Sequence, residues 1–259
     1  ISEDFGYEVI HLERNMGKRS AIAKAMERNF SEITVLVDSD SALESDALKQ
    51  GLRGFYSQNT AAICGHTDVA NSKATWLTRM QSQQYFIAFK TFKSLEGFFR
   101  SVICCSGAFS LYRTDSIRPL IEEWENQTFL GRSRTFGDDR GLTNLLLREG
   151  YDTIYVSEAK AKTIVPNNAK TYLRQQLRWR RSFLMESLSG LSHMWKRPIG
   201  ASVIFYMVLS LTLMSPFVVS YFLLVGPIVD SFNPLVYLIG LALIIFLHQT
   251  FYWAFQLPP

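Results

Sequence analysis

The sequence predicts an α/β domain with a mixed, mostly parallel sheet and helices on both faces, followed by an amphipathic helix and transmembrane helices. Apolar, β-branched runs of strand length alternate with helical patterns as far as about residue 165. All 27 lysines and arginines of the 259-residue chain lie at or before Arg197, and Asp230 is the only formally charged residue beyond it. This asymmetry divides the chain into an α/β domain (residues 1–168), a basic amphipathic helix (169–197) and an apolar segment (198–259).

The first predicted elements are a strand at residues 7–12 and a helix that begins near Ser20. The loop between them contains Gly17, Lys18 and Arg19. Free backbone N–H groups at a helix start, together with two cations, suit an anion. A solvated loop has the same composition, so both interpretations stay open.

Residues 33–37 (ITVLV) predict a buried parallel strand that leads into Asp38 and Asp40. Open α/β sheets bind ligands at the carboxyl ends of their strands. Carboxylate oxygens there suit Mg²⁺ or Mn²⁺ bridging a diphosphate. The alternative is that the two acids belong to a turn that caps the following helix, predicted at residues 44–51.

The middle of the domain predicts a strand beginning at residues 61–64, a helix at 75–99, a strand at 101–112 that breaks at Gly107, and a helix at 114–125. The glycine allows a ligand or another backbone to approach closely. Aromatic side chains recur in the helix at residues 75–99, and their spacing favours a place in the core over a ligand platform. These aromatics are Trp76, Tyr85, Phe86, Phe89 and Phe92.

The three cysteines, Cys64, Cys104 and Cys105, form no metal-type CxxC pair. We expect them to be reduced, small and buried strand residues.

Asp138, Asp139 and Arg140 open a short helix that ends near Gly150. The two acids could cap this helix and favour its dipole. Tandem acids beside an arginine, in a chain that already has Asp38 and Asp40, also suit a general base. Two further strands are predicted at residues 151–156 and 159–165.

Residues 170–197 predict one amphipathic helix. Its apolar stripe consists of Leu173, Leu177, Leu184, Leu188, Leu191 and Trp195. Its basic face carries Lys170, Arg174, Arg178, Arg180 and Arg181. A basic amphipathic helix of this kind commonly lies flat at a membrane surface.

Two uncharged segments, at about residues 199–225 and 234–256, are long enough to span a bilayer. The connector GPIVDSFNP reads as a turn at the far membrane face. The basic residues before Pro198 place the α/β domain on the cytoplasmic side by the positive-inside rule. A helical hairpin buried in a soluble core is the alternative.

In order along the chain, these motifs resemble those of processive, membrane-embedded family 2 glycosyltransferases. The motifs are NMGKR (15–19), VDSD (37–40), TWLTR (75–79), CSG (105–107), NQTFLG (126–131), GDDRGLTN (137–144) and QxxRW (175–179). NQTFLG and GDDRGLTN are most similar to hyaluronan synthases, and NMGKR, TWLTR and the run YLRQQLRW also resemble the nodulation-type chitin-oligosaccharide synthases. The resemblance covers nearly the whole chain and implies a GT-A-type fold.

The resemblance implies a role for each acidic motif. Asp38 and Asp40 match the DxD that holds a divalent ion, Mg²⁺ or Mn²⁺, on the diphosphate of the sugar nucleotide. Asp139 matches the general base that takes a proton from the acceptor hydroxyl, while Asp138 and Arg140 position it.

For the binding residues the resemblance implies that Gln175 and Trp179 hold the acceptor sugar and that Arg178 contacts the diphosphate. Lys18 and Arg19, with Asp38, would contact the nucleotide sugar. Cys105, Ser106 and Gly107 would line the acceptor end of the site.

The expected activity is inverting, processive synthesis of an N-acetylglucosamine-containing polysaccharide, most similar to hyaluronan synthesis from UDP-GlcNAc and UDP-GlcA. A chitin-type synthase using UDP-GlcNAc alone is the alternative, because the segment FIAFKTFKSLEGFF (86–99) departs from the hyaluronan synthase pattern. From other classes, a non-catalytic membrane scaffold would tolerate loss of the acids that are present here. A transferase acting on a lipid phosphate would leave QxxRW unexplained.

The expected partners are the UDP-sugars, the growing polysaccharide and the lipid bilayer of the plasma membrane, in a multi-pass arrangement. Nucleic-acid binding is not expected, because the basic residues cluster at a membrane boundary rather than along a groove. The family's first strand, its uridine-contacting acidic motif and its late gating motif have no counterpart in the sequence. We therefore expect the chain to be a fragment.

Overall fold

The computed structural model describes residues 9–229 and 231–256. It divides into two compact units, residues 1–198 and 199–259. The first unit contains every residue proposed above for catalysis or binding. The last charged residue of this unit is Arg197, directly before its end at Pro198.

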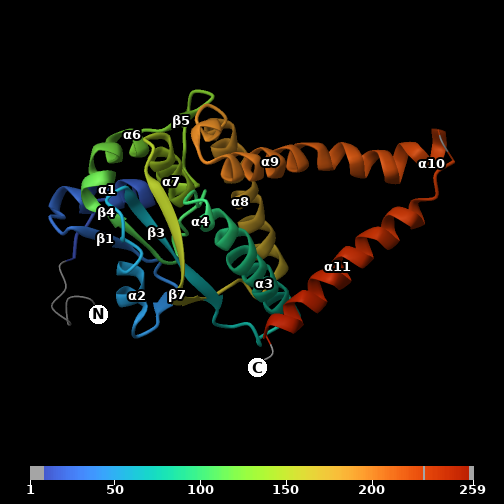
Figure 1. Ribbon diagram of the computed structural model, residues 1–259, viewed down its shortest axis with the longest axis horizontal. Coiled ribbons are helices and arrows are strands. Elements are labelled where there is room, and N and C mark those ends of the chain that lie inside the picture. The colour runs from blue at the N-terminus through green and yellow to red at the C-terminus, as the bar shows by residue number, and fades with distance from the viewer. Residues whose placement is uncertain (1–8, 230, 257–259) are drawn as a thin grey trace. The chain divides into compact units, whose positions relative to one another are not determined.

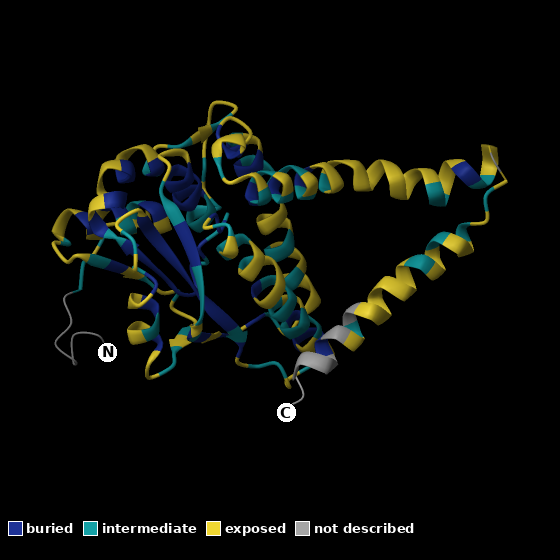
Figure 2. Cartoon of the chain, viewed as in Figure 1, coloured by how far each residue is buried: buried dark blue, intermediate teal, exposed yellow. Residues whose placement is uncertain are grey.

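A five-stranded sheet forms the centre of the first unit, in the order β1-β4-β3-β7-β2 among the described residues (Figure 1). β3 is buried along almost its whole length (Figure 2). A separate two-stranded hairpin pairs β5 with β6. The bounds are β1 Ile33–Leu36, β2 Ser41–Leu43, β3 Thr60–Val69, β4 Ser110–Arg113, β5 Thr128–Phe129, β6 Arg132–Ser133 and β7 Asp152–Thr163.

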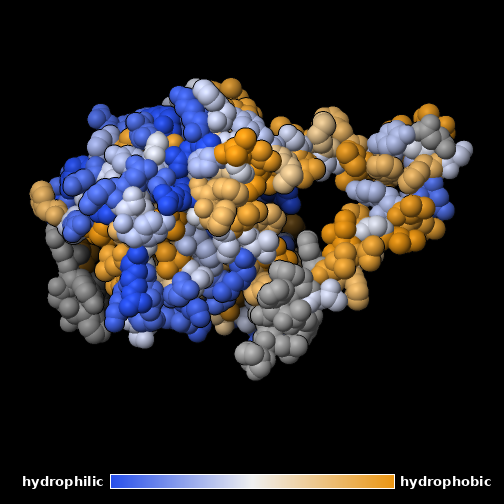
Figure 3. Space-filling model, viewed as in Figure 1, coloured by the Kyte–Doolittle hydropathy of each residue, from blue (hydrophilic) through white to orange (hydrophobic). Residues whose placement is uncertain are grey.

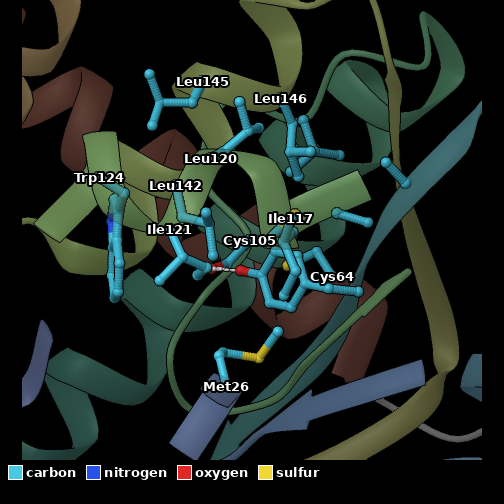
Figure 4. Close-up of a cluster of buried hydrophobic side chains, with 14 of the residues drawn as sticks. Met26, Cys64, Cys105, Ile117, Leu120, Ile121, Trp124, Leu142, Leu145 and Leu146 are labelled. Atoms are coloured by element: carbon cyan, nitrogen blue, oxygen red, sulfur yellow. Dashed lines mark hydrogen bonds between the residues drawn. The ribbon is translucent and has the colours of Figure 1, made fainter. Parts of the chain in front are cut away.

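Helices cover both faces of this sheet, as predicted. On one face, α2 (Ala47–Leu52) brings Ala47 against Ile63 and Leu111. On the other face a larger cluster forms between the sheet and α1, α6 and α7, and Figure 4 shows its members Met26, Cys64 and Trp124. Alternate residues of β3 and β4 therefore serve the two cores, as the pleat of a sheet requires.

The remaining helices of the first unit lie close to where the sequence predicts them. Between residues 76 and 98 the helix is interrupted by a π-helical segment, η2. The helix at 114–125 is divided by a 3₁₀ turn at Pro119. The bounds are α1 Lys18–Arg28, α3 Trp76–Ile87, η2 Ala88–Lys93, α4 Ser94–Phe98, α5 Thr114–Ile117, η3 Arg118–Leu120, α6 Ile121–Glu125, α7 Asp138–Arg148, α8 Ala169–Gly190 and η4 Met194–Lys196.

The sheet is mixed, but the prediction that it is mostly parallel is wrong. Only β3 and β7 pair in parallel among the described strands, whereas β1 with β4, β3 with β4, and β2 with β7 are antiparallel. Strands covered on both faces carry continuous apolar runs whichever way they point. The sequence pattern therefore identifies the strands without giving their directions.

Three strand predictions also need correction. Residues 9–12 form no strand, and residues 7 and 8 of that prediction lie outside the described residues. The segment at 101–105 contributes only an isolated bridge from Ser101 to Thr153. The two strands predicted at 151–156 and 159–165 are one strand, β7, whose pairing with β3 shifts register between Gly65 and His66.

The predicted amphipathic helix is α8 followed by the 3₁₀ turn η4, and Asn168 caps it by accepting a 2.9 Å hydrogen bond from the backbone of Thr171. Its buried residues are Ser182, Glu186, Ser187 and Gly190. Its apolar stripe is largely exposed, with Leu173, Leu177, Leu188, Leu191 and Trp195 all on the surface. The helix thus docks on the domain through a polar face.

The second unit is helical. One continuous helical stretch, Ile199–Val229, has the length and composition of a membrane-spanning helix, with a mean hydropathy of 2.1. It comprises α9 (Ile199–Ser220), the π-helical η5 (Tyr221–Val225) and α10 (Gly226–Val229), so part of the predicted connector is helical. The second predicted span coincides with α11, Pro234–Gln256. Its apolar part, Pro234–Leu247, is shorter than a membrane-spanning helix. Among the described residues, one helix is therefore long and apolar enough to cross a membrane, and its surface is mainly hydrophobic (Figure 3).

Candidate active site

Asp38 follows β1 and meets the first residue of α1. The Lys18 ammonium donates a hydrogen bond to Asp38 Oδ1, and both side chains remain partly exposed. The helix begins after Gly17, whose φ of 87° is a conformation that glycine adopts readily. The loop predicted to suit an anion therefore delivers its lysine to the first acid of the DxD motif.

Asp40 lies beside the end of β7. Its Oδ1 accepts a hydrogen bond of 3.3 Å from the Thr163 hydroxyl, and its carbonyl accepts one from the backbone of Ile164. The remaining carboxylate oxygens of Asp38 and Asp40 fit a hard divalent cation. Within the described residues no group of three or more His, Cys, Asp and Glu side chains could hold a metal ion, so substrate or water oxygens would complete its coordination.

Gly107 joins the DxD motif to the predicted base. A methyl group at Gly107 would lie 3.2 Å from both carboxylate oxygens of Asp38 and 2.9 Å from Lys18 Nζ. The backbone N–H of the same glycine donates to Asp139 Oδ2 over 3.3 Å. Asp38 and Asp139, on separate elements, thus converge on one residue that has no side chain.

Asp139 lies in the first turn of α7 and is held at both carboxylate oxygens. Its Oδ1 accepts a 2.8 Å bond from the backbone of Arg140. Its Oδ2 is also 3.5 Å from the Cys104 thiol. Burial, and next the charge of Asp139, raise the pKa of this thiol to about 12, so it is a protonated donor and not a thiolate.

Thr143 is a supporting residue to which the sequence analysis gave no role. Its hydroxyl donates to the Asp139 carbonyl over 2.7 Å and accepts from the Cys105 backbone over 2.9 Å. It therefore ties the first turn of α7 to the loop that carries Gly107. The signal in the sequence is its place one helical turn after Asp139.

Arg19 is buried, in contrast to the prediction that it contacts the nucleotide. Its guanidinium is 6% exposed and donates to Asp138 Oδ1 at 2.8 Å, the Trp124 carbonyl at 2.7 Å and Gln127 Oε1 at 3.0 Å. Trp124 Nε1 in turn donates to the Asp138 carbonyl. Arg19 thus holds the residue that precedes the predicted base. Its partners lie more than a hundred positions away in the sequence, so local pattern could not find them.

The other predicted acceptor residues divide into two groups. Cys105 is fully buried in the larger hydrophobic cluster and contributes to the core, so its side chain does not line a site (Figure 4). Ser106 is half-buried and accepts a 3.4 Å bond from the backbone of Ala108. Lys93, at the end of the π-helical segment, donates a hydrogen bond to the Cys104 carbonyl. This bond helps to fix the loop that carries Gly107.

The QxxRW residues lie on α8. Trp179 is 40% exposed, and its ring centroid is 6.3 Å from that of Tyr85 on α3. Gln175 has a buried Oε1 without a hydrogen-bond partner. Arg178 opens instead into a hollow of about 190 Å³, which it lines together with Phe136, Arg174, Leu177 and Arg181. Among the described residues no contact joins Arg178 directly to Asp38 or Asp40.

Arg140 stacks over the ring of Phe183 on α8, with its guanidinium carbon 4.9 Å from the ring centroid. This contact fixes the side chain away from the carboxylate that its backbone N–H binds. The residue therefore positions α7 against α8 as well as supporting Asp139.

The fold is that of the GT-A glycosyltransferases. A mannosyltransferase from Pyrobaculum calidifontis, solved in complex with GDP-mannose and Mn²⁺, aligns with a TM-score of 0.62 at 14% identity over 95% of this chain and 65% of its own. The mixed sheet with helices on both faces is the part of the molecule that this likeness describes.

Sequence comparison identifies the family. The family model for chitin synthase matches residues 4–253, and the chain belongs to this group of family 2 glycosyltransferases. An N-acetylglucosaminyltransferase from Azorhizobium caulinodans is 38% identical over 181 residues, which are 70% of this chain and 46% of that protein. A hyaluronan synthase from Streptococcus pyogenes is 38% identical over 187 residues, 72% of this chain and 44% of that protein. The chain thus spans less than half the length of these curated relatives.

Proposed function

We propose that this glycosyltransferase transfers N-acetylglucosamine from UDP-GlcNAc, inverts its anomeric carbon and adds units processively to a polysaccharide. The observation that carries the proposal is the convergence of Asp38 and Asp139 on Gly107. A sugar nucleotide whose diphosphate lies at Asp38 has its anomeric carbon a few ångströms away, where a base must meet the acceptor hydroxyl.

In the proposed reaction Asp139 accepts the proton of the acceptor hydroxyl while that oxygen attacks the anomeric carbon and the bond to UDP breaks. The hydrogen bonds from Gly107 N–H and Arg140 N–H fix the carboxylate in place. Asp138, anchored by Arg19, holds the start of α7. Because the base is already held in place before the substrate binds, the entropic cost of orienting it in the transition state is small.

Asp38 and Asp40 would hold the divalent cation, and a cation there would neutralise charge on the departing UDP. Lys18 lies at the same carboxylate and would exchange Asp38 for a phosphate oxygen. Arg178, in a hollow that also holds Arg174 and Arg181, would contribute a further cation toward phosphate. None of these three arginines has an ion-pair partner among the described residues.

Gln175 and Trp179 would receive the acceptor, since an exposed indole face suits the apolar face of a pyranose ring. The exposed leucine stripe of α8 and the spanning helix Ile199–Val229 support a place at the lipid bilayer. On this proposal the enzyme is a multi-pass protein of the plasma membrane with its catalytic domain in the cytoplasm.

The motifs at residues 126–131 and 137–144 favour hyaluronan, which needs UDP-GlcA as well as UDP-GlcNAc. The relatives that match include both N-acetylglucosaminyltransferases and hyaluronan synthases. A chitin-type product from UDP-GlcNAc alone is therefore the second candidate.

The test uses membranes that contain the complete gene product and Mn²⁺ or Mg²⁺, and measures UDP release with each sugar nucleotide alone and with both. Release only with both, giving a polymer that hyaluronidase degrades, is the expected result. Sustained release with UDP-GlcNAc alone identifies a chitin-type enzyme. The variant Asp139→Asn should lose about 10²–10⁴-fold in kcat, and full turnover by this variant would overturn the proposed base.

A further inference from the structure

Tyr85 contacts Trp179 of the QxxRW motif across two helices. It lies in the last turn of α3, directly before the π-helical segment. α3 and α8 run side by side (Figure 1), and Gln84 donates to the Tyr172 hydroxyl across them over 3.4 Å. The sequence analysis placed Tyr85 in the core with the other aromatics of this helix, but it is only half-buried.

The Tyr85 ring is held in place by a buried aromatic side chain. It stacks on Phe89 with ring centroids 6.0 Å apart and an interplanar angle of 23°. Phe89 is 4% exposed and is itself fixed by the edge of His66 at 5.4 Å and by Tyr155 at 6.3 Å. This row of rings leaves Tyr85 little freedom to move, so it is a rigid surface and not a mobile surface side chain.

Besides Phe89, the Tyr85 ring contacts Trp179 on α8. Their ring centroids are 6.3 Å apart and their planes are tilted by 55°. Rings this close leave no room for a sugar between them. Because Trp179 is 40% exposed, the two rings together offer an aromatic surface on which pyranose faces can lie.

The Tyr85 hydroxyl is under the electrostatic influence of the catalytic acids. Asp40, Asp38 and Asp139 are the carboxylates whose charges reach this hydroxyl, and burial together with these charges raises its pKa. The hydroxyl has no hydrogen-bond partner among the described residues. The ring therefore contacts Trp179, and its hydroxyl is influenced by the charges of the catalytic acids.

We propose that Tyr85 is an acceptor-binding residue that forms, with Trp179, the aromatic floor under the terminal sugars of the growing chain. The inference rests on the proposed function and extends it, because nothing in the QxxRW motif assigns a second aromatic residue. The ligand class is a β-linked N-acetylhexosamine oligosaccharide, whose apolar ring faces can stack on the two aromatic side chains. The ring makes the floor, so a phenylalanine at this position retains it.

The experiment compares Tyr85→Leu and Tyr85→Phe with the unaltered protein in detergent, using chitotetraose as acceptor and UDP-GlcNAc as donor. Loss of one aromatic–sugar contact of roughly 1 kcal/mol corresponds to about a five-fold change in affinity. We expect Tyr85→Leu to raise the acceptor KM about five-fold and to leave the UDP-GlcNAc KM unchanged, in a protein whose folded state thermal unfolding confirms. Tyr85→Phe should keep the acceptor KM of the unaltered protein.

Tyr56→Leu is the matched control. Tyr56 is 64% exposed, and its ring contacts the Arg100 guanidinium. Direct binding of chitotetraose by calorimetry provides a readout that does not depend on turnover. An unchanged acceptor KM in Tyr85→Leu, or a change confined to the UDP-GlcNAc KM, would overturn the inference. Absence of any sugar transfer by the unaltered protein would instead overturn the proposed function.

Discussion

Arg19 Nε donates a 2.8 Å hydrogen bond to Asp138 Oδ1, the carboxylate directly before the proposed base. The arginine is almost fully buried, and its other nitrogens bind carbonyl and amide oxygens around the start of α7. A residue of the NMGKR motif thereby supports the GDDR motif without being placed to touch a substrate. The two motifs form one structural unit.

The variant Arg19→Gln should lower kcat by about 10–100-fold, because small displacements of a base cost this much. The KM for UDP-GlcNAc should stay within about two-fold, since Arg19 lies behind the site. Arg19→Lys, which retains the charge, should be intermediate. Steady-state kinetics on protein with a confirmed fold measures both constants. A raised UDP-GlcNAc KM with unchanged kcat would favour the nucleotide contact that the sequence predicts.

Gly107→Ala tests the convergence of the two acids. The added methyl would lie 2.9 Å from Lys18 Nζ and 3.2 Å from the Asp38 oxygens, so Lys18 and Asp38 must separate from each other or from the loop. Because these side chains must move by only a few tenths of an ångström, we expect kcat/KM to fall about 10-fold, with little change in thermal stability. Gly150→Ala has open space around it and serves as a control for the handling of the protein, although its φ of 87° costs some stability. Wild-type activity in Gly107→Ala would contradict the arrangement.

Metal dependence follows from the oxygen donors of Asp38 and Asp40. Removal of divalent cations with EDTA should abolish UDP release, and Mn²⁺ or Mg²⁺ should restore it. Asp40→Asn should raise the Mn²⁺ concentration needed for half-maximal activity about 10–100-fold, because one charged ligand is lost. Asp115→Asn, at the start of α5, is the matched control. Full activity in EDTA would exclude the metal site.

The sequence predicts the local elements and the motif residues well, because both are encoded over short distances. The helix starts at Lys18, Trp76 and Asp138 follow from the spacing of polar and apolar residues. The directions of the strands could not be predicted, since buried parallel and antiparallel strands have the same pattern. The burial of Arg19 depends on Trp124 and Asp138, which only the folded chain brings to it.

For the candidate site too, the sequence predicts the motif residues but not the contacts between distant motifs. Asp38 and Asp139 were identified as separate motifs, and their approach to Gly107 emerges only from the fold. The aromatic residues of α3 and η2 show the limit of periodicity. Phe89 is in the core as predicted, whereas Trp76 is 77% exposed. Trp76 opens α3 and Phe89 follows it by thirteen positions, so even a regular helix places the two on nearly opposite sides.

Removal of one partner from the buried pair of Arg134 and Glu186 should cost far more stability than removal of one partner from a surface pair. Its atoms are 2.5 Å apart, its side chains are 7% and 1% exposed, and Asn144 and Ser189 complete its hydrogen bonds. Glu186→Gln leaves a buried guanidinium without its counter-ion and should lower the free energy of unfolding by about 3–5 kcal/mol. Denaturant unfolding in detergent measures the change.

Glu123→Gln is the control for this prediction. Its pair with Arg148 has the same 2.5 Å separation but is exposed, so its loss should cost about 0–1 kcal/mol. The two pairs have the same shortest N–O separation and differ strongly in burial, so the comparison tests the effect of burial. Equal effects of the two variants would show that the Arg134–Glu186 pair is not desolvated in solution.

His193, in the turn after α8, should make the folded state sensitive to acid. Its side chain is buried, its Nε2 has no hydrogen-bond partner, and Arg148, Arg197 and Lys196 supply positive charge around it. Burial first, and then these cations, lower its pKa from 6.5 to about 4. Between these two values the unfolded chain binds a proton that the folded chain excludes. The stabilising contribution of neutral His193 is therefore complete above pH 6.5 and declines as the pH falls toward 4.

The variant His193→Gln removes this titration and should unfold at a midpoint that depends less on pH between 6.5 and 4. His11→Gln, a substitution of an exposed histidine, should retain the acid dependence of the unaltered protein. Unfolding midpoints measured across this range test the sign directly, because a histidine stabilised in its charged form would give the opposite slope. If the unaltered protein becomes more stable on acidification and His193→Gln abolishes that gain, His193 is protonated in the fold. Its contacts with the neighbouring cations must then be screened by solvent or by a bound anion.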